Sequence, residues 1–134
     1  LIAKSIIKKN FKSVAVLGLS YKGNLKVDIL SPTIPFVEYL HQKKVKVDLY
    51  DPFYSKKEIK DKTGLNSLNY PKDLAKYDCI IITVDHDFFK KNFSKTRKYL
   101  TKCKFILDNM GAWKNFEIPK KLNIKYQEKK IGYE

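Results

Sequence analysis

Near its start the chain reads Val14-Ala15-Val16-Leu17-Gly18-Leu19-Ser20-Tyr21-Lys22-Gly23-Asn24. The short apolar run, rich in β-branched residues, predicts a buried strand that ends at Gly18. A polar loop follows, and the apolar periodicity of residues 34–40, just after Ser31-Pro32, predicts a helix. Loop amides and the Lys22 ammonium therefore gather at the carboxyl end of a strand. Parallel sheets bind ligands there, and such a loop suits an anion.

The rest of the chain alternates strand and helix patterns. Strands are predicted at 45–50, 79–84 and 104–108, with an edge strand within 118–126, and helical segments at 34–43, 55–62, 71–77 and 86–100. Strands that are apolar nearly throughout and alternate with helices are typical of a parallel sheet covered on both faces. We therefore predict an α/β fold, a three-layer, doubly wound, mainly parallel sheet with helices on both faces.

Length and composition fit one domain. The 134 residues, 43% of them hydrophobic, can bury one core. No run approaches the ~20 apolar residues of a membrane span, and no signal-peptide pattern is present, so we expect a cytoplasmic protein without a membrane partner. Because the chain begins with Leu1, residues 1–12 are interpreted as the end of a linking helix from a missing upstream region. Residues 13–134 then form the domain.

The chain is strongly basic, with 28 basic and 14 acidic residues and a net charge of +14. Such a surface could attract nucleic acid, anionic lipid or an anionic small molecule. The lysines are spread along the whole chain rather than interleaved with aromatics in one block, and Arg97 is the only arginine. Since arginine is the better reader of bases, we predict no nucleic-acid partner and assign most of the charge to a solvated surface.

The sequence shows no metal-binding or catalytic constellation. Cys79 and Cys103 lack the Cys-x-x-Cys spacing and a nearby histidine pair, so we predict two idle thiols and no metal site. A disulfide between them stays an alternative. No Ser/His/Asp or Cys/His arrangement is legible, and we predict no catalytic residue in this chain.

The loop at Gly18 fails two known phosphate-binding patterns. Gly-x-Gly-x-x-Gly is absent because Ser20 stands at the second glycine position, and Asn24-Leu25 stands where a P-loop requires Lys-Ser/Thr. The fold is therefore Rossmann-like but lacks the NAD fingerprint. Asp51, at the end of the second strand, sits where a ribose-binding acid would lie. Without the glycines, we interpret Asp51-Pro52 as a turn that ends the strand.

Two further polar loops follow predicted strands. In Asp85-His86-Asp87 we predict that Asp85 caps a helix and that His86 lines a crevice. The second loop, Asp108-Asn109-Met110-Gly111, precedes Trp113, which is interpreted as a core anchor. In a doubly wound sheet, these loops and residues 18–30 are expected to meet at one crevice.

Five motifs in order resemble a known family. They are residues 14–24, Ser31-Pro32, Tyr50-Asp51-Pro52, Val84-Asp85-His86-x-x-Phe89 and Asp108-x-x-Gly111-x-Trp113. Together they look like the C-terminal, UDP-binding domain of the UDP-glucose/GDP-mannose dehydrogenase family, most like its UDP-N-acetyl-D-mannosamine dehydrogenase branch. The resemblance covers about positions 5–132.

The resemblance implies a part of an NAD-dependent enzyme that oxidises the C6 alcohol of a UDP-sugar to a uronic acid. NAD and the catalytic cysteine would belong to the absent N-terminal part, so this chain alone should not turn over. The full-length protein would be a homodimer or a larger oligomer. A UDP-glucose 6-dehydrogenase, and a diverged, non-catalytic nucleotide-binding or assembly module, are alternatives.

Carried over by position, the resemblance implies a UDP-sugar site made by Gly18, Leu19, Ser20, Tyr21, Lys22, Asn24 and His86. Its lysine supplies a point charge suited to a diphosphate. The chain departs from the family where Ile29 and Leu30 replace an arginine and a glutamate, and where Met110 replaces a basic residue. Ile29 and Leu30 favour the non-catalytic alternative.

Overall fold

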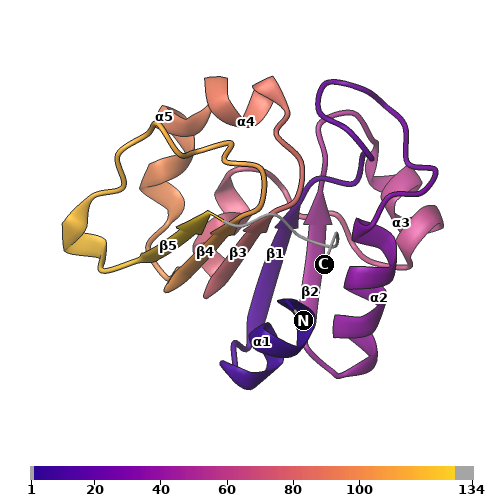
Figure 1. Ribbon diagram of the computed structural model, residues 1–134, viewed down its shortest axis with the longest axis horizontal. Coiled ribbons are helices and arrows are strands. Elements are labelled where there is room, and N and C mark those ends of the chain that lie inside the picture. Colours follow the sequence, from indigo (N-terminus) through magenta and orange to yellow (C-terminus); the bar gives the residue numbers. More distant parts are fainter. Residues whose placement is uncertain (1, 129–134) are drawn as a thin grey trace.

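The apolar strands form one five-stranded sheet in the computed structural model, which describes residues 2–128. The strand order is β2-β1-β3-β4-β5, and every pairing is parallel (Figure 1). The strands are β1 (Ser13–Leu17), β2 (Lys46–Tyr50), β3 (Cys79–Ile82), β4 (Phe105–Asp108) and β5 (Lys125–Glu128). The predicted α/β fold with a doubly wound parallel sheet is confirmed.

Helices connect the strands, as parallel pairing requires. They are α1 (Ile2–Lys8), α2 (Thr33–Gln42), α3 (Lys56–Thr63), η1 (Lys72–Lys76), α4 (Asp87–Lys91), α5 (Phe93–Thr96), η2 (Arg97–Tyr99) and η3 (Lys120–Leu122). The predicted helix at 55–62 is confirmed as α3. Ser55 and Glu58 form a reciprocal capping box at its start, and Gly64 ends it with a left-handed φ of 77°.

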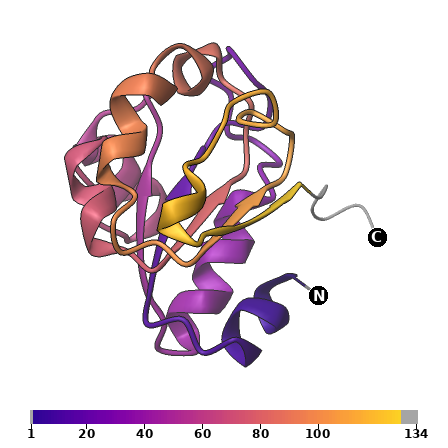
Figure 2. The ribbon, with the colours of Figure 1, turned by 90° about the vertical axis from the view of Figure 1, so that its left-hand side faces the viewer.

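The two faces of the sheet bury separate clusters because successive side chains of a strand point to opposite faces. Val14 and Val16 of β1 pack on the face covered by α1, α2 and α3, with Leu40 of α2 and Ile59 of α3. Ala15 and Leu17 of the same strand face the other cluster, which includes Leu74 of η1, Phe89 of α4 and Trp113. Figure 2 shows α1 and α2 together on one side of the sheet. The core role predicted for Trp113 is confirmed, since its side chain is fully buried.

Two strand boundaries differ from the sequence prediction. β3 ends at Ile82 instead of residue 84, and Thr83 follows it with its N–H donating to the Leu17 carbonyl at 2.9 Å and its hydroxyl to the Gly18 carbonyl at 2.6 Å. The edge strand starts only at Lys125 because η3 precedes it and Asn123 adopts a left-handed φ of 55°. Polar residues, Thr83 after β3 and Asn123 before β5, therefore lie next to these strand ends.

Both cysteines are free and buried, as predicted. Burial raises the pKa of the Cys79 thiol and brings the pKa of Cys103 to about 12, so neither is an activated nucleophile. Among the helices of residues 2–128, none has the length and apolar character needed to cross a membrane.

Candidate functional site

A cavity of about 320 Å³ lies at the carboxyl ends of β1, β3 and β4. The loop after β1 arches over this edge of the sheet, next to β2 (Figure 1). The lining residues come from all three polar loops and from the start of α2: Ser20, Tyr21, Lys22, Gly23, Pro32, Thr33, Thr83, Val84, Asp85, Asn109 and Met110. The structure thus brings together the three loops that the sequence predicted to share a crevice.

Two glycines allow this close assembly. Gly18 has a φ of 122°, and a Cβ built there would lie 2.6 Å from Thr83 Oγ1 and 2.7 Å from Val84 Cγ2. At Gly23, a Cβ would lie 2.5 Å from Asp85 Oδ1. A larger residue at Gly18 would press against Thr83 and Val84, and one at Gly23 would first displace the Asp85 side chain.

The predicted site residues divide into two groups. Ser20, Tyr21 and Lys22 line the cavity. Gly18 and the buried Leu19 lie behind it and support the loop. Asn24 and His86 do not line the cavity, and a ligand contact for either stays a prediction.

His86 and Asn24 instead join two loops. The Asn24 N–H donates to His86 Nδ1 at 2.9 Å, and Asn24 Oδ1 accepts from the Asp87 N–H at 2.8 Å. His86, at the N-cap position of α4, makes no side-chain capping bond to that helix. The prediction that Asp85 caps α4 is wrong, because the helix begins at Asp87 and Asn24 satisfies its first N–H.

A buried carboxylate completes this network. Asp51 Oδ2 lies 2.9 Å from His86 Nε2 and accepts the N–H groups of Leu19 at 2.7 Å and Ser20 at 3.1 Å. Its Oδ1 accepts from the Phe53 N–H at 2.8 Å, which is the turn predicted after β2. Burial alone would raise the pKa of Asp51, but the His86 bond and the backbone donors hold it below its usual value.

This arrangement does not fit a dinucleotide. The carboxylate at the ribose-binding position would have to face a ligand, whereas Asp51 is fully buried and its acceptors are taken by His86 and the backbone. Together with the missing glycine fingerprint, this excludes the Rossmann mode of NAD binding for the described residues.

The third loop is fixed by a second buried carboxylate. Asp108 accepts the N–H of Ala112 at 2.8 Å on Oδ1, and the N–H of Trp113 at 2.7 Å and the Tyr126 hydroxyl at 2.6 Å on Oδ2. These bonds shape the turn that carries Asn109 and Met110 into the cavity. The sequence predicted that this loop lies at the crevice but did not single out Asn109 as a lining residue. Its position directly after β4 could have identified it.

The segment that departs from the family is exposed. Ile29 and Leu30 are 73% and 84% exposed, and neither lines the cavity. Two exposed ion pairs tether the loop to α3: Lys26 with Glu58 at 2.7 Å, and Asp28 with Lys62 at 3.1 Å. Of the three replacements, Ile29 and Leu30 therefore lie outside the cavity, whereas Met110 lies in its wall.

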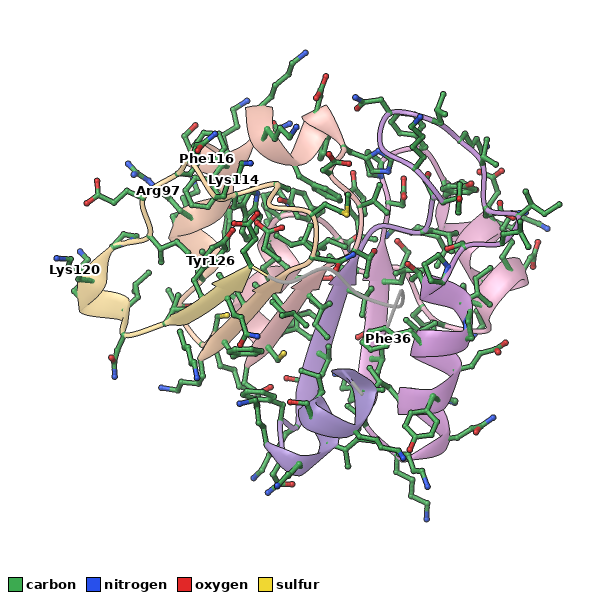
Figure 3. All side chains as sticks on the ribbon, in the orientation of Figure 1. Phe36, Arg97, Lys114, Phe116, Lys120 and Tyr126 are labelled. Carbon is green, nitrogen blue, oxygen red and sulfur yellow. The ribbon has the colours of Figure 1, made fainter. Side chains whose placement is uncertain are left out.

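Further basic side chains lie outside the cavity lining. An open hollow of about 530 Å³ near the start of β2 is lined in part by His41, Lys44, Lys46 and Lys60. Figure 3 shows Arg97, Lys114 and Lys120 around the β5 side of the molecule, and Phe36 on α2. Within residues 2–128, no three histidine, cysteine or acidic side chains group as a metal site would require.

A family sequence model supports the interpretation of this cavity. The model of the UDP binding domain of the UDP-glucose/GDP-mannose dehydrogenase family matches residues 15–115. That range includes the three loops that line the cavity.

Individual relatives point the same way. A UDP-N-acetyl-D-mannosamine dehydrogenase of Methanocaldococcus jannaschii is 38% identical over 92 residues, covering 69% of this chain and 20% of that protein. One from Methanococcus vannielii is 32% identical over 110 residues, covering 75% and 24%. A UDP-N-acetyl-D-glucosamine 6-dehydrogenase of Salmonella typhi is 29% identical over 117 residues, covering 79% and 27%. This chain spans about a quarter of the length of these relatives.

Solved structures share the fold. The UDP-D-ManNAc dehydrogenase of Pyrococcus horikoshii superposes with a TM-score of 0.68 at 26% identity, covering 96% of this chain and 28% of that one. A GDP-mannose dehydrogenase of Pseudomonas aeruginosa gives a TM-score of 0.67 at 18% identity over 94% of this chain and 30% of that one, a likeness of fold alone.

Proposed function

Since the chain belongs to the UDP-glucose/GDP-mannose dehydrogenase family, through its UDP binding domain, we propose that it holds the UDP part of a UDP-sugar. The observation that carries this proposal is the cavity of about 320 Å³ at the carboxyl ends of β1, β3 and β4. The exposed Lys22 lines it and supplies a cation for the diphosphate. Ser20, Thr33 and Thr83 add hydroxyl groups to the same wall.

The proposed whole protein is an NAD-dependent nucleotide-sugar 6-dehydrogenase that acts on UDP-N-acetyl-D-mannosamine or a close relative. The names of the most similar relatives support an N-acetylated sugar over UDP-glucose. In this proposal the cofactor and the reacting cysteine belong to another part of the protein, and this chain contributes the nucleotide grip. The proposed oligomer is a homodimer or larger.

The direct test is a calorimetric titration of UDP into the 134-residue chain. Lys22→Met should weaken UDP binding by about 1–3 kcal/mol, the range of a charge-assisted hydrogen bond. It should leave uridine binding unchanged, because uridine has no diphosphate. Lys44→Met is the matched control, since Lys44 lines the other hollow. If the wild-type chain ignores UDP, or if both lysine variants behave alike, the proposed grip is wrong.

A second candidate is a non-catalytic nucleotide-binding or assembly module. The observation that favours it is the exposure of Ile29 and Leu30, which stand where the family usually carries an arginine and a glutamate. The sequence upstream of Leu1 separates the two candidates. A Gly-x-Gly-x-x-Gly motif and a catalytic cysteine there would support the dehydrogenase, and their loss from an otherwise matching upstream region would support the module.

A further inference from the structure

Asn109 presents an unsatisfied acceptor at the cavity. The residue is 6% exposed and lines the cavity at the end of β4. Its backbone N–H donates to the Ile82 carbonyl at 2.9 Å, which fixes the residue at the strand end. Its side-chain Oδ1, however, is buried and has no hydrogen-bond partner among the described residues. An acceptor buried without a donor destabilises the free protein, so a ligand donor is the natural complement.

The charges around the cavity indicate which part of a ligand Asn109 meets. Of the residues that line the cavity, Lys22 and Asp85 carry opposite charges and the others are neutral. The lining therefore carries no net charge, and only the part of the cavity at Lys22 offers a cation to a diphosphate. Met110, next to Asn109, adds an apolar surface.

The sheet sets the distance between the two ends of the site. Lys22 follows β1, Asn109 follows β4, and β3 lies between these strands. Two strand spacings separate the carboxyl ends of β1 and β4 by about 10 Å, and Lys22 lies in the loop beyond the end of β1. With the diphosphate at Lys22, another group of the ligand is the one expected at Asn109.

We propose that Asn109 is a specificity-determining residue that accepts a hydrogen bond from a neutral O–H or N–H group of the bound UDP-sugar. This inference rests on the proposed function and extends it to a second point of the same cavity. The donor belongs either to the uridine, through its ring N–H or ribose hydroxyls, or to the sugar ring. A ligand without such a donor would leave Oδ1 unpaired and would be rejected for that reason.

The test compares wild type, Asn109→Leu and Asn109→Ala by calorimetry with UDP and with UDP-N-acetyl-D-mannosamine. Asn109→Leu should weaken binding roughly 5- to 100-fold, the effect of one lost hydrogen bond in a buried site. Loss with both ligands places the donor in the UDP part, and loss with the UDP-sugar alone places it on the sugar. Asn66→Leu is the control, because Asn66 is an exposed asparagine after α3, and it should bind as wild type does.

Unfolding in urea supplies a readout that a structural role would not give. Because Asn109→Leu removes an unpaired buried acceptor, the ligand-free variant should be as stable as wild type or more stable. Weaker binding without a loss of stability is the expected result. If wild type binds and both Asn109 variants bind as tightly as wild type, the inference is overturned and the proposed function stands. If wild type binds neither ligand, both are overturned.

Discussion

His86 Nε2 lies 2.9 Å from Asp51 Oδ2, and both side chains are fully buried. Because the Asn24 N–H donates to His86 Nδ1, that nitrogen carries no proton, and the ring is the neutral tautomer with its proton on Nε2. The imidazole therefore accepts a hydrogen bond from Asn24 and donates one to Asp51, which connects the two loops. Phe53 stacks on the ring, with centroids 4.6 Å apart. Nitrogen NMR of the histidines should show the Nε2–H tautomer for His86, and an Nδ1–H signal would contradict this assignment.

Removing the carboxylate charge should destabilise the fold. Asp51→Asn keeps the size of the side chain but replaces an acceptor of four hydrogen bonds with an amide that has one acceptor oxygen. We expect a loss of about 2–4 kcal/mol in the free energy of unfolding. Urea denaturation measures it, with the exposed Asp61→Asn as the control. Equal stability of the two variants would show that the network contributes little.

The same carboxylate predicts a pH dependence. A carboxyl with a lowered pKa in the folded state contributes stability that is complete above its unfolded pKa of about 3.9. That contribution is lost as pH falls through the lowered folded value. Wild type should therefore lose stability below about pH 4, and Asp51→Asn should lose less over the same range.

An exposed group must be separated from this effect. The hydrogen bond from Lys26 lowers the pKa of Glu58 to about 2, so Glu58 titrates in the same range. Because the Lys26–Glu58 pair is on the surface, salt screens it, whereas the interactions of the buried Asp51 carboxylate are screened much less. The difference between wild type and Asp51→Asn should persist at 1 M salt. A difference that disappears in salt would assign the pH dependence to the surface.

Gly18→Ala should destabilise the chain more than Gly64→Ala. Both glycines have positive φ; at Gly64, in the left-handed region at 77°, an alanine incurs backbone strain of about 1–2 kcal/mol, and the φ of 122° at Gly18 suits an alanine no better. At Gly64 the new methyl meets nothing within 4 Å, whereas at Gly18 it lies 2.6 Å from Thr83 Oγ1. We expect the Gly18 variant to be at least ~1 kcal/mol less stable than the Gly64 variant in urea. Similar values would show that the loop yields to the methyl at little cost.

Tyr126→Phe should loosen the third loop. The change removes the hydroxyl that donates to Asp108 at 2.6 Å and keeps the ring in place. The expected cost is about 1–2 kcal/mol in unfolding free energy. Backbone amides of residues 109–113 should exchange faster with solvent. Tyr39→Phe, at a half-buried position of α2, is the control, and unchanged exchange in the Tyr126 variant would contradict the role given to Asp108.

The sequence predicted the parallel sheet and the meeting of its loops, because hydrophobic periodicity and the alternation of strands with helices along the chain are local patterns. The family suggested by five short motifs is confirmed by the match over residues 15–115. The Asp51–His86 pair could not be found this way, since its members are 35 residues apart and each has an ordinary local explanation. The cap of α4 was misassigned for the same reason, because Asn24 reaches it from another loop. Hydrogen-bond partners that are far apart in the sequence cannot be recognised from the spacing of residues within a motif.

The cavity also ties ligand binding to folding. Its walls come from residues 20–23, from Asp85 and from Met110, so about 90 residues of chain must be in place before the site exists. A ligand there would bind the native state and not the unfolded chain. At a concentration 100 times Kd it would raise the free energy of unfolding by about 2.7 kcal/mol. The melting temperature of this chain would thus serve as a gauge of nucleotide occupancy.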